Sequence, residues 1–141
     1  MAAPAQKIWE VVSDVTNTGR FSPETFEAEW LDGATGPGVG VRFRGHVKRN
    51  QRGPVYWTTC RITECEPGKA FAFDVIFGGY RANTWRYEFS PNGDGTDVTE
   101  SYELPKNLGT RIYSLIAGRA RNRTNVNGMR QTLERIKAVV E

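Results

Sequence analysis

The middle of the chain alternates hydrophobic and polar residues with a period of two, which is the pattern of β-strands that bury one face. Residues 41–48 give the clearest example. One side of this predicted strand carries Val41, Phe43, Gly45 and Val47, and the other carries Arg42, Arg44, His46 and Lys48. Similar runs between residues 26 and 104, separated by short turns rich in glycine and proline, predict about six strands in an antiparallel sheet.

Helical spacing replaces this alternation at both ends of the chain. A short helix is predicted after Pro4, with its apolar side formed by Ile8, Trp9, Val12 and Val15. A long amphipathic helix is predicted between Leu104-Pro105 and the C-terminus, with an apolar stripe of Val126, Met129, Leu133, Ile136 and Val140. This order indicates an α+β domain in which the apolar face of a curved sheet lies on the closing helix. A hollow between the two would suit a small apolar molecule.

Composition narrows the class of protein. The 141 residues suffice for one core, and the absence of repeats and linkers predicts a single domain over residues 1–141. Four Trp, five Tyr and seven Phe supply large rings for a core and a pocket. A net charge of +3 is too small to indicate a nucleic-acid binder. Without a signal peptide or a long apolar run, we expect a cytoplasmic protein with no membrane insertion.

The metal-binding residue types are sparse. Cys60 and Cys65 lie five residues apart in one predicted strand, so we expect them on opposite faces and as reduced thiols. His46 is the only histidine, and its polar neighbours predict that it is exposed rather than catalytic. These positions favour no metal site. No cofactor is implied.

Several stretches resemble the START-like, or helix-grip, superfamily (SRPBCC). The resemblance is carried by residues 3–14 (APAQKIWEVVSD), 21–24 (FSPE), 38–45 (GVGVRFRG), 66–68 (EPG), 85–89 (WRYEF) and 95–100 (GTDVTE). Within the superfamily, the chain is most similar to the bacterial polyketide cyclase/dehydrase-type proteins that are common in actinobacteria. The resemblance implies a curved antiparallel sheet wrapped around the long C-terminal helix. Members include aromatase/cyclases, lipid carriers, hormone receptors and co-chaperones, so the fold alone does not decide the activity.

One departure from the family pattern concerns the N-terminus. The family places an edge strand before the Ala-Pro helix, whereas only three residues precede Pro4 here. A sheet without this strand has an exposed edge, and exposed edges pair with other chains. We therefore expect a tendency to form a homodimer.

Glu100 is the strongest candidate for chemistry. By the alternation of its strand it lies on the same face as Tyr102 and Leu104, which is the side toward the helix. A carboxylate there is unfavourable unless it is paired, and Arg119 or Asn122 on the closing helix could be the partner. Glu100 is then either a general acid/base or polar anchor with a perturbed pKa, or one half of a structural ion pair.

The candidate ligand contacts come from both the sheet and the helix. Asn122 lies near the centre of the apolar stripe, where it could bond a ligand carbonyl or satisfy backbone groups and internal water. Arg119 could anchor an acidic ligand, remain solvated, or pair with Glu100. The other candidates, which could equally be core residues, are Phe43, Tyr56, Phe73, Trp85, Tyr87, Tyr102 and Met129.

Three classes of function follow from these observations. The first is binding of a small hydrophobic molecule, aromatic or polyketide-like, with proton transfer at Glu100 promoting cyclisation or dehydration. The alternative is a non-catalytic carrier or sensor of a lipid or small molecule that uses the same hollow. An interaction module working through the basic sheet face would instead show salt-sensitive binding to a polyanion.

Overall fold

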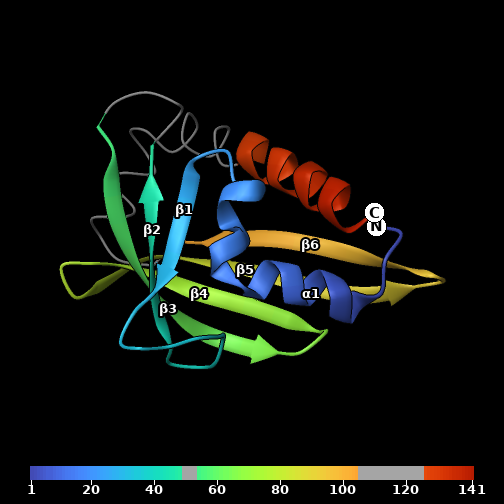
Figure 1. Ribbon diagram of the computed structural model, residues 1–141, viewed down its shortest axis with the longest axis horizontal. Helices are drawn as coiled ribbons and strands as arrows, with labels where there is room; N and C mark the ends of the chain where they lie inside the picture. Colours follow the sequence, from blue (N-terminus) through green and yellow to red (C-terminus); the bar gives the residue numbers. More distant parts are fainter. Residues whose placement is uncertain (49–53, 105–125) are drawn as a thin grey trace.

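A computed structural model describes residues 1–48, 54–104 and 126–141. Two short helical elements come first, α1 (Ala5–Ser13) and the 3₁₀ helix η1 (Val15–Arg20). The strands follow as β1 (Thr25–Trp30), β2 (Arg42–Val47), β3 (Tyr56–Glu66), β4 (Ala70–Phe77), β5 (Tyr80–Asn92) and β6 (Gly95–Glu103). A helix over residues 126–140 ends the chain (Figure 1).

The six strands form one antiparallel sheet in the order β1-β2-β3-β4-β5-β6. The sheet curls strongly. Phe43 on β2 and Phe73 on β4 lie two strands apart, a separation of roughly 10 Å in a flat sheet, yet their ring centroids are 5.1 Å apart. The curled sheet together with the C-terminal helix confirms the expected α+β, helix-grip fold.

Helix α1 and the C-terminal helix contribute to one hydrophobic core against the inner, concave face of the sheet. Trp9 of α1 donates a hydrogen bond from Nε1 to the carbonyl oxygen of Ala70 at 2.9 Å, which fixes the helix on β4. The C-terminal helix contributes Ile136 and Val140, the buried end of its predicted stripe. The core therefore lies between α1, the end of the C-terminal helix at Ile136 and Val140, and the sheet.

The two ends of the chain meet beside β6, as Figure 1 shows. The amino group of Met1 donates to the Thr96 carbonyl at 2.7 Å, and the Thr96 amide donates to the Met1 carbonyl at 2.8 Å. A Cβ atom on Gly95 would stand 2.5 Å from the Met1 carbonyl oxygen, so this approach requires glycine. The Ala2 amide donates to Glu141 at 2.6 Å. The first residues thus connect the start of β6 to the end of the C-terminal helix.

A β-bulge in β3 corrects the expectation for the two cysteines. Ile62 pairs with Phe73, but Cys65 pairs with Phe71, because one additional residue is inserted between Ile62 and Glu64. Cys65 therefore shares the inner face with Cys60, and the prediction of opposite faces is wrong. Both thiols are free. Burial raises the pKa of Cys60 to about 12 and also raises that of Cys65, which makes both poor nucleophiles.

Candidate functional site

Strand register brings five predicted residues together on the inner face. Phe73 on β4 pairs with Trp85 on β5, which pairs with Tyr102 on β6. One step along the same face, Tyr87 pairs with Glu100. We call Phe73, Trp85, Tyr87, Glu100 and Tyr102 the inner-face cluster. The ring centroids of Trp85 and Tyr102 are 5.5 Å apart, so the two rings are in contact. The cluster therefore presents a continuous aromatic surface beside one carboxyl group.

Burial changes along this face. Near α1 the large side chains Phe71, Tyr87 and Phe89 are buried in the core. Farther along the same strands, Phe73, Trp85 and Tyr102 are only half-buried. The core is therefore fully covered at the α1 end, while the aromatic surface beyond Tyr87 and Glu100 is partly open. A ligand that added to the core would contact this part of the face.

The Tyr87–Glu100 pair lies at the boundary between the two parts. The Tyr87 hydroxyl donates to Oε1 of Glu100 at 3.0 Å. The other carboxyl oxygen, Oε2, is closed off from solvent and has no hydrogen-bond partner in residues 1–48, 54–104 or 126–141. A buried carboxyl oxygen without a partner is costly, so this atom is where a ligand group would bring the largest gain.

The pKa values of the pair are shifted by burial. Desolvation raises the pKa of Glu100 to about 8, against the smaller lowering effect of the hydrogen bond from Tyr87. Desolvation and the neighbouring carboxylate hold the pKa of Tyr87 well above its ordinary value. Glu100 is therefore largely protonated at neutral pH. A carboxyl group in this state can donate a hydrogen bond or a proton to a bound molecule.

The remaining predicted contacts lie in different surroundings. Phe43 is buried and packs edge-on against Trp30 and Phe73, so it belongs to the core beneath the cluster. Tyr56 is half-buried on β3 opposite Val47. Met129 is half-buried on the C-terminal helix. Arg119 and Asn122, the two helix residues proposed as partners of Glu100, lie outside the described residues.

The Tyr87–Glu100 contact itself was missed by the sequence analysis, although the sequence carried a signal for it. The turn Gly93-Asp94 joins β5 and β6, and Asn92 pairs with Gly95. A two-residue turn fixes the register of the whole hairpin. Counting back from this turn places Tyr87 opposite Glu100.

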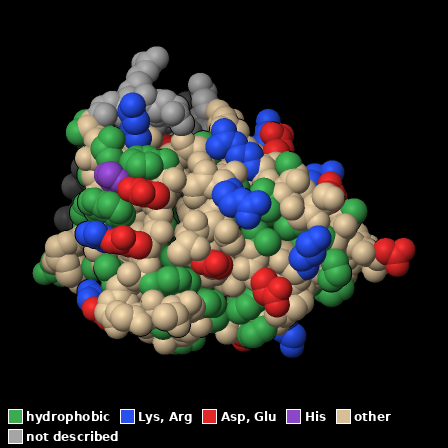
Figure 2. All heavy atoms as spheres, in the orientation of Figure 1, with side chains coloured by type: hydrophobic (Ala, Val, Ile, Leu, Met, Phe, Trp, Pro, Cys, Tyr) green, Lys and Arg blue, Asp and Glu red, His purple; other side chains and the backbone are tan. Residues whose placement is uncertain are grey.

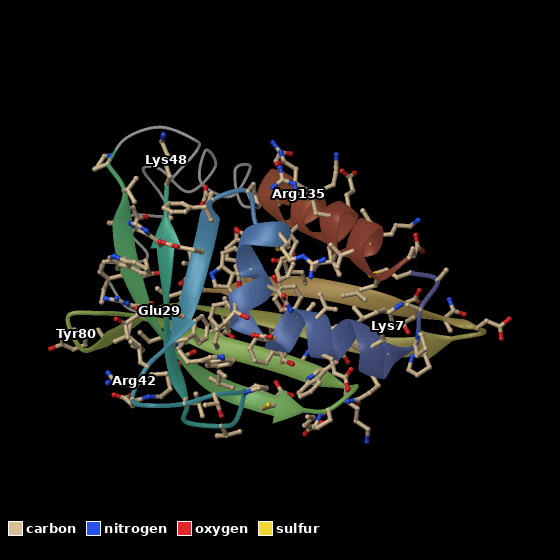
Figure 3. All side chains as sticks on the ribbon, in the orientation of Figure 1. Lys7, Glu29, Arg42, Lys48, Tyr80 and Arg135 are labelled. Atoms are coloured by element: carbon tan, nitrogen blue, oxygen red, sulfur yellow. The ribbon has the colours of Figure 1, made fainter. Side chains whose placement is uncertain are left out.

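The outer, convex face of the sheet carries charges in pairs. Arg42 bonds Asp32 at 2.8 Å, and Arg44 bonds Glu29. Arg86 bonds Glu64 at 2.9 Å and Glu88 at 3.0 Å. Figure 3 shows Glu29 and Arg42 on the neighbouring strands β1 and β2. The predicted basic face is therefore largely neutralised by acidic neighbours.

An aromatic stack lies on the same outer face. His46 stacks on Trp57 with 4.1 Å between ring centroids, and the Arg44 guanidinium lies 4.2 Å from the Trp57 ring. Glu27 bonds Nδ1 of His46 at 2.7 Å, and Phe26 contacts its ring. In Figure 2 the histidine side chain, in purple, lies among hydrophobic and acidic side chains. The stack holds the histidine in place and was not predicted from the sequence.

The described part of the chain has neither a membrane-spanning helix nor a metal-binding cluster. No helix in it is long and apolar enough to cross a membrane. It also contains no group of three or more His, Cys, Asp or Glu side chains arranged to hold a metal ion.

Comparison with known proteins places the chain in a family. A family model described as polyketide cyclase/dehydrase and lipid transport matches residues 1–141. A protein from Chromobacterium violaceum has a similar structure, with a TM-score of 0.67, 18% identity, and coverage of 100% of this chain and 92% of that one. A polyketide-cyclase-like protein from Corynebacterium glutamicum has a TM-score of 0.56 and 27% identity, with coverage of 100% and 85%.

A protein from a biosynthetic pathway also shares the fold. The di-domain ARO/CYC StfQ from the steffimycin biosynthetic pathway has a TM-score of 0.67 and 19% identity, and the match covers 100% of this chain and 42% of StfQ. No curated protein matches the sequence. Since the family model spans every residue, the chain belongs to the polyketide cyclase/dehydrase and lipid transport family.

Proposed function

We propose that this protein binds a small hydrophobic molecule, aromatic or polyketide-like, on its inner face between the sheet and the C-terminal helix. The family description supports a hydrophobic ligand. The observation that carries the proposal is the Glu100 carboxyl group, whose Oε2 atom is hidden from solvent and unpartnered among the described residues, next to half-buried aromatic rings. An isolated buried carboxyl is unfavourable for stability, and its place beside open aromatic surface favours a role in binding.

The chemistry we propose for a bound substrate is proton transfer. Glu100 would donate a proton to an oxygen of the substrate and recover it later, which promotes dehydration or ring closure. The similarity in fold to the ARO/CYC StfQ supports this reading. Substrate folding against the inner-face cluster would supply the orientation that such a reaction needs.

The second candidate is a carrier or sensor without catalysis. One observation favours it: among described residues, the inner-face cluster contains a single carboxyl group, and Tyr87 beside it is held protonated. A two-group acid/base mechanism would therefore need a second residue from elsewhere. A carrier needs only the apolar surface and one polar anchor.

Replacing Glu100 by Gln separates these candidates, with Glu103→Gln as the matched control on the exposed side of β6. Purification from the native host followed by native mass spectrometry would supply the bound molecule. For an enzyme, Glu100→Gln should abolish turnover of that molecule while binding persists, and Glu103→Gln should change neither. Unchanged turnover in Glu100→Gln would remove Glu100 from the mechanism. An absence of bound molecules and of binding to any aromatic probe would contradict the proposal as a whole.

We also propose that the chain forms a homodimer through the free edge of β6. The turn at Gly93-Asp94 makes Asn92 and Gly95 a hydrogen-bonded pair, so the outward backbone groups of β6 include those of Thr96, Val98 and Glu100. Met1 bonds those of Thr96, whereas no described residue bonds those of Val98 and Glu100. Unpaired edge groups favour strand pairing between subunits.

Light scattering at increasing concentration tests the dimer. The variant that should disrupt the dimer is Thr99→Lys, which places a charge on the exposed side of the same edge. We expect a dimer for the wild type and a monomer for this variant. A wild-type protein that stays monomeric at high concentration would contradict the proposal.

A further inference from the structure

We infer that the inner-face cluster selects uncharged aromatic ligands that carry a hydrogen-bond-accepting oxygen, such as a ketone, and that Glu100 donates to this oxygen. This inference rests on the proposed function, because it specifies the ligand of the same site. It also excludes a class of ligand, since a cationic amine would require the opposite protonation state.

The hydrogen-bond inventory of the pair gives the direction of donation. The Tyr87 hydroxyl has one hydrogen, and it is directed to Oε1 of Glu100. Oε1 therefore acts as the acceptor in the carboxyl group. In the neutral acid the proton then lies on Oε2, the oxygen that lacks a partner among the described residues. The group that a ligand meets is thus a donor, and its complement is an oxygen acceptor.

The charges around Glu100 favour the neutral form. The nearest cation along the hairpin, Arg86, points to the outer face and is bonded to both Glu64 and Glu88. The described neighbours of Glu100 on the inner face, Tyr87, Val98 and Tyr102, carry no positive charge. Burying an amine against an ionised carboxylate would require the desolvation of two charges, whereas a ketone and a neutral acid require none.

The rings beside the carboxyl group define the body of the ligand. Trp85 and Tyr102 are the neighbours of Tyr87 and Glu100 along their strands, and all four side chains project to the same face. Trp85 lies diagonally opposite Glu100 across the hairpin, a relation that places side chains about 7–8 Å apart, within the span of a flat two-ring molecule. A flat molecule lying on Trp85 and Tyr102 can therefore place an oxygen at Oε2.

Three naphthalenes of similar size test the inference: 2-acetylnaphthalene presents a ketone, 2-ethylnaphthalene presents no acceptor, and 2-(aminomethyl)naphthalene presents a cation. Dissociation constants are measured by equilibrium dialysis at pH 6.5 with wild type, Glu100→Gln and Glu100→Leu. Gln retains an N–H donor without charge, whereas Leu removes the donor and fills a similar volume. Circular dichroism and thermal unfolding verify that both variants fold.

We expect the wild type to bind the ketone roughly tenfold more tightly than the ethyl compound, the effect of one net hydrogen bond. Glu100→Gln should keep this preference, and Glu100→Leu should lose it while still binding the ethyl compound. Tightest binding of the amine, lost in Glu100→Gln, would overturn the inference and indicate an ionised anchor. Equal binding of all three probes would also overturn it and leave hydrophobic binding intact. Failure of every probe to bind the wild type would overturn both the inference and the proposed function.

Discussion

The two faces of the sheet are built from the same strands but treat their polar groups differently. On the outer face, Arg44 is bonded to Glu29 and also contacts Trp57, and these groups remain partly exposed to water. On the inner face, Glu100 has one bonded oxygen and one buried oxygen without a described partner. The outer polar groups bond one another, whereas one oxygen of the inner carboxyl group has no described hydrogen-bond partner.

This difference indicates which polar residues are candidates for ligand binding. Exposed charges in mutual pairs add little to stability and present no unmet bonding group to a partner. A buried carboxyl with an unmet bonding position destabilises the empty protein, and a ligand can remove that cost. The number of charges on a face is therefore a weaker guide than the completeness of their contacts. The outer face has many charges, whereas the inner face has one carboxyl group with an unmet bonding position.

The largest expected effect comes from the buried part of the inner face. Phe71 is 1% exposed, and Phe71→Ala should reduce the free energy of unfolding by about 3–5 kcal/mol because it leaves a cavity. Urea unfolding followed by tryptophan fluorescence measures this loss. Thr59→Ala on the middle of β3 is the control and should change stability by less than about 0.5 kcal/mol. Similar losses for both variants would mean that the two faces do not differ as described.

The next effect is a pH dependence produced by the inner carboxyl group of Glu100. The pKa of Glu100 is about 8 in the folded protein and 4.5 as its ordinary value. Between these values the unfolded chain has released the proton that the folded protein retains. The contribution of Glu100 to the free energy of unfolding should therefore be fully present below pH 4.5. It should fall by up to about 1.4 kcal/mol per pH unit between pH 4.5 and pH 8, and level off above pH 8.

The difference between wild type and Glu100→Gln isolates this contribution. Tyr87 is the other titratable group that contacts Glu100, and its raised pKa keeps it protonated over this range. Unfolding in urea at pH values from 4.5 to 8 should give a falling curve for the wild type and a flatter one for Glu100→Gln. The outer-edge control Glu103→Gln should retain the wild-type slope. Parallel curves for wild type and Glu100→Gln would show that Glu100 is not buried in the folded protein.

Much of the fold could be predicted from the sequence because it depends on local patterns. The alternation in residues 42–47 and the helical spacing of Ile8, Trp9 and Val12 both appear as buried faces in the structure. The position of Cys65 could not be predicted, because the bulge at residues 62–64 arises from pairing with β4 and leaves no mark in the spacing. Alternation holds only until one residue is inserted.

The candidate site was predictable only in part, for the same reason. The face of Glu100 followed from alternation, and its register with Tyr87 could have been counted from the turn at Gly93-Asp94. The outer stack of His46 on Trp57 depends on the register of β2 and β3, which alternation alone does not fix. Burial of a single carboxyl oxygen depends on the curl of the whole sheet, and a linear pattern contains no information about it.

The smallest expected effect concerns the outer face, where the individual contacts should be weak and independent of the ligand site. A double-mutant cycle with Arg44→Ala and Glu29→Ala should give a coupling of about 0.2–1 kcal/mol that shrinks in 1 M NaCl, because exposed ion pairs are screened. A second cycle with Arg44→Ala and Trp57→Leu should give about 0.5–1 kcal/mol, with less loss in salt. Binding of 2-acetylnaphthalene should be the same in all these variants. A coupling above about 2 kcal/mol or a change in probe affinity would mean that the outer face supports the inner site, since contacts this exposed are worth less on their own.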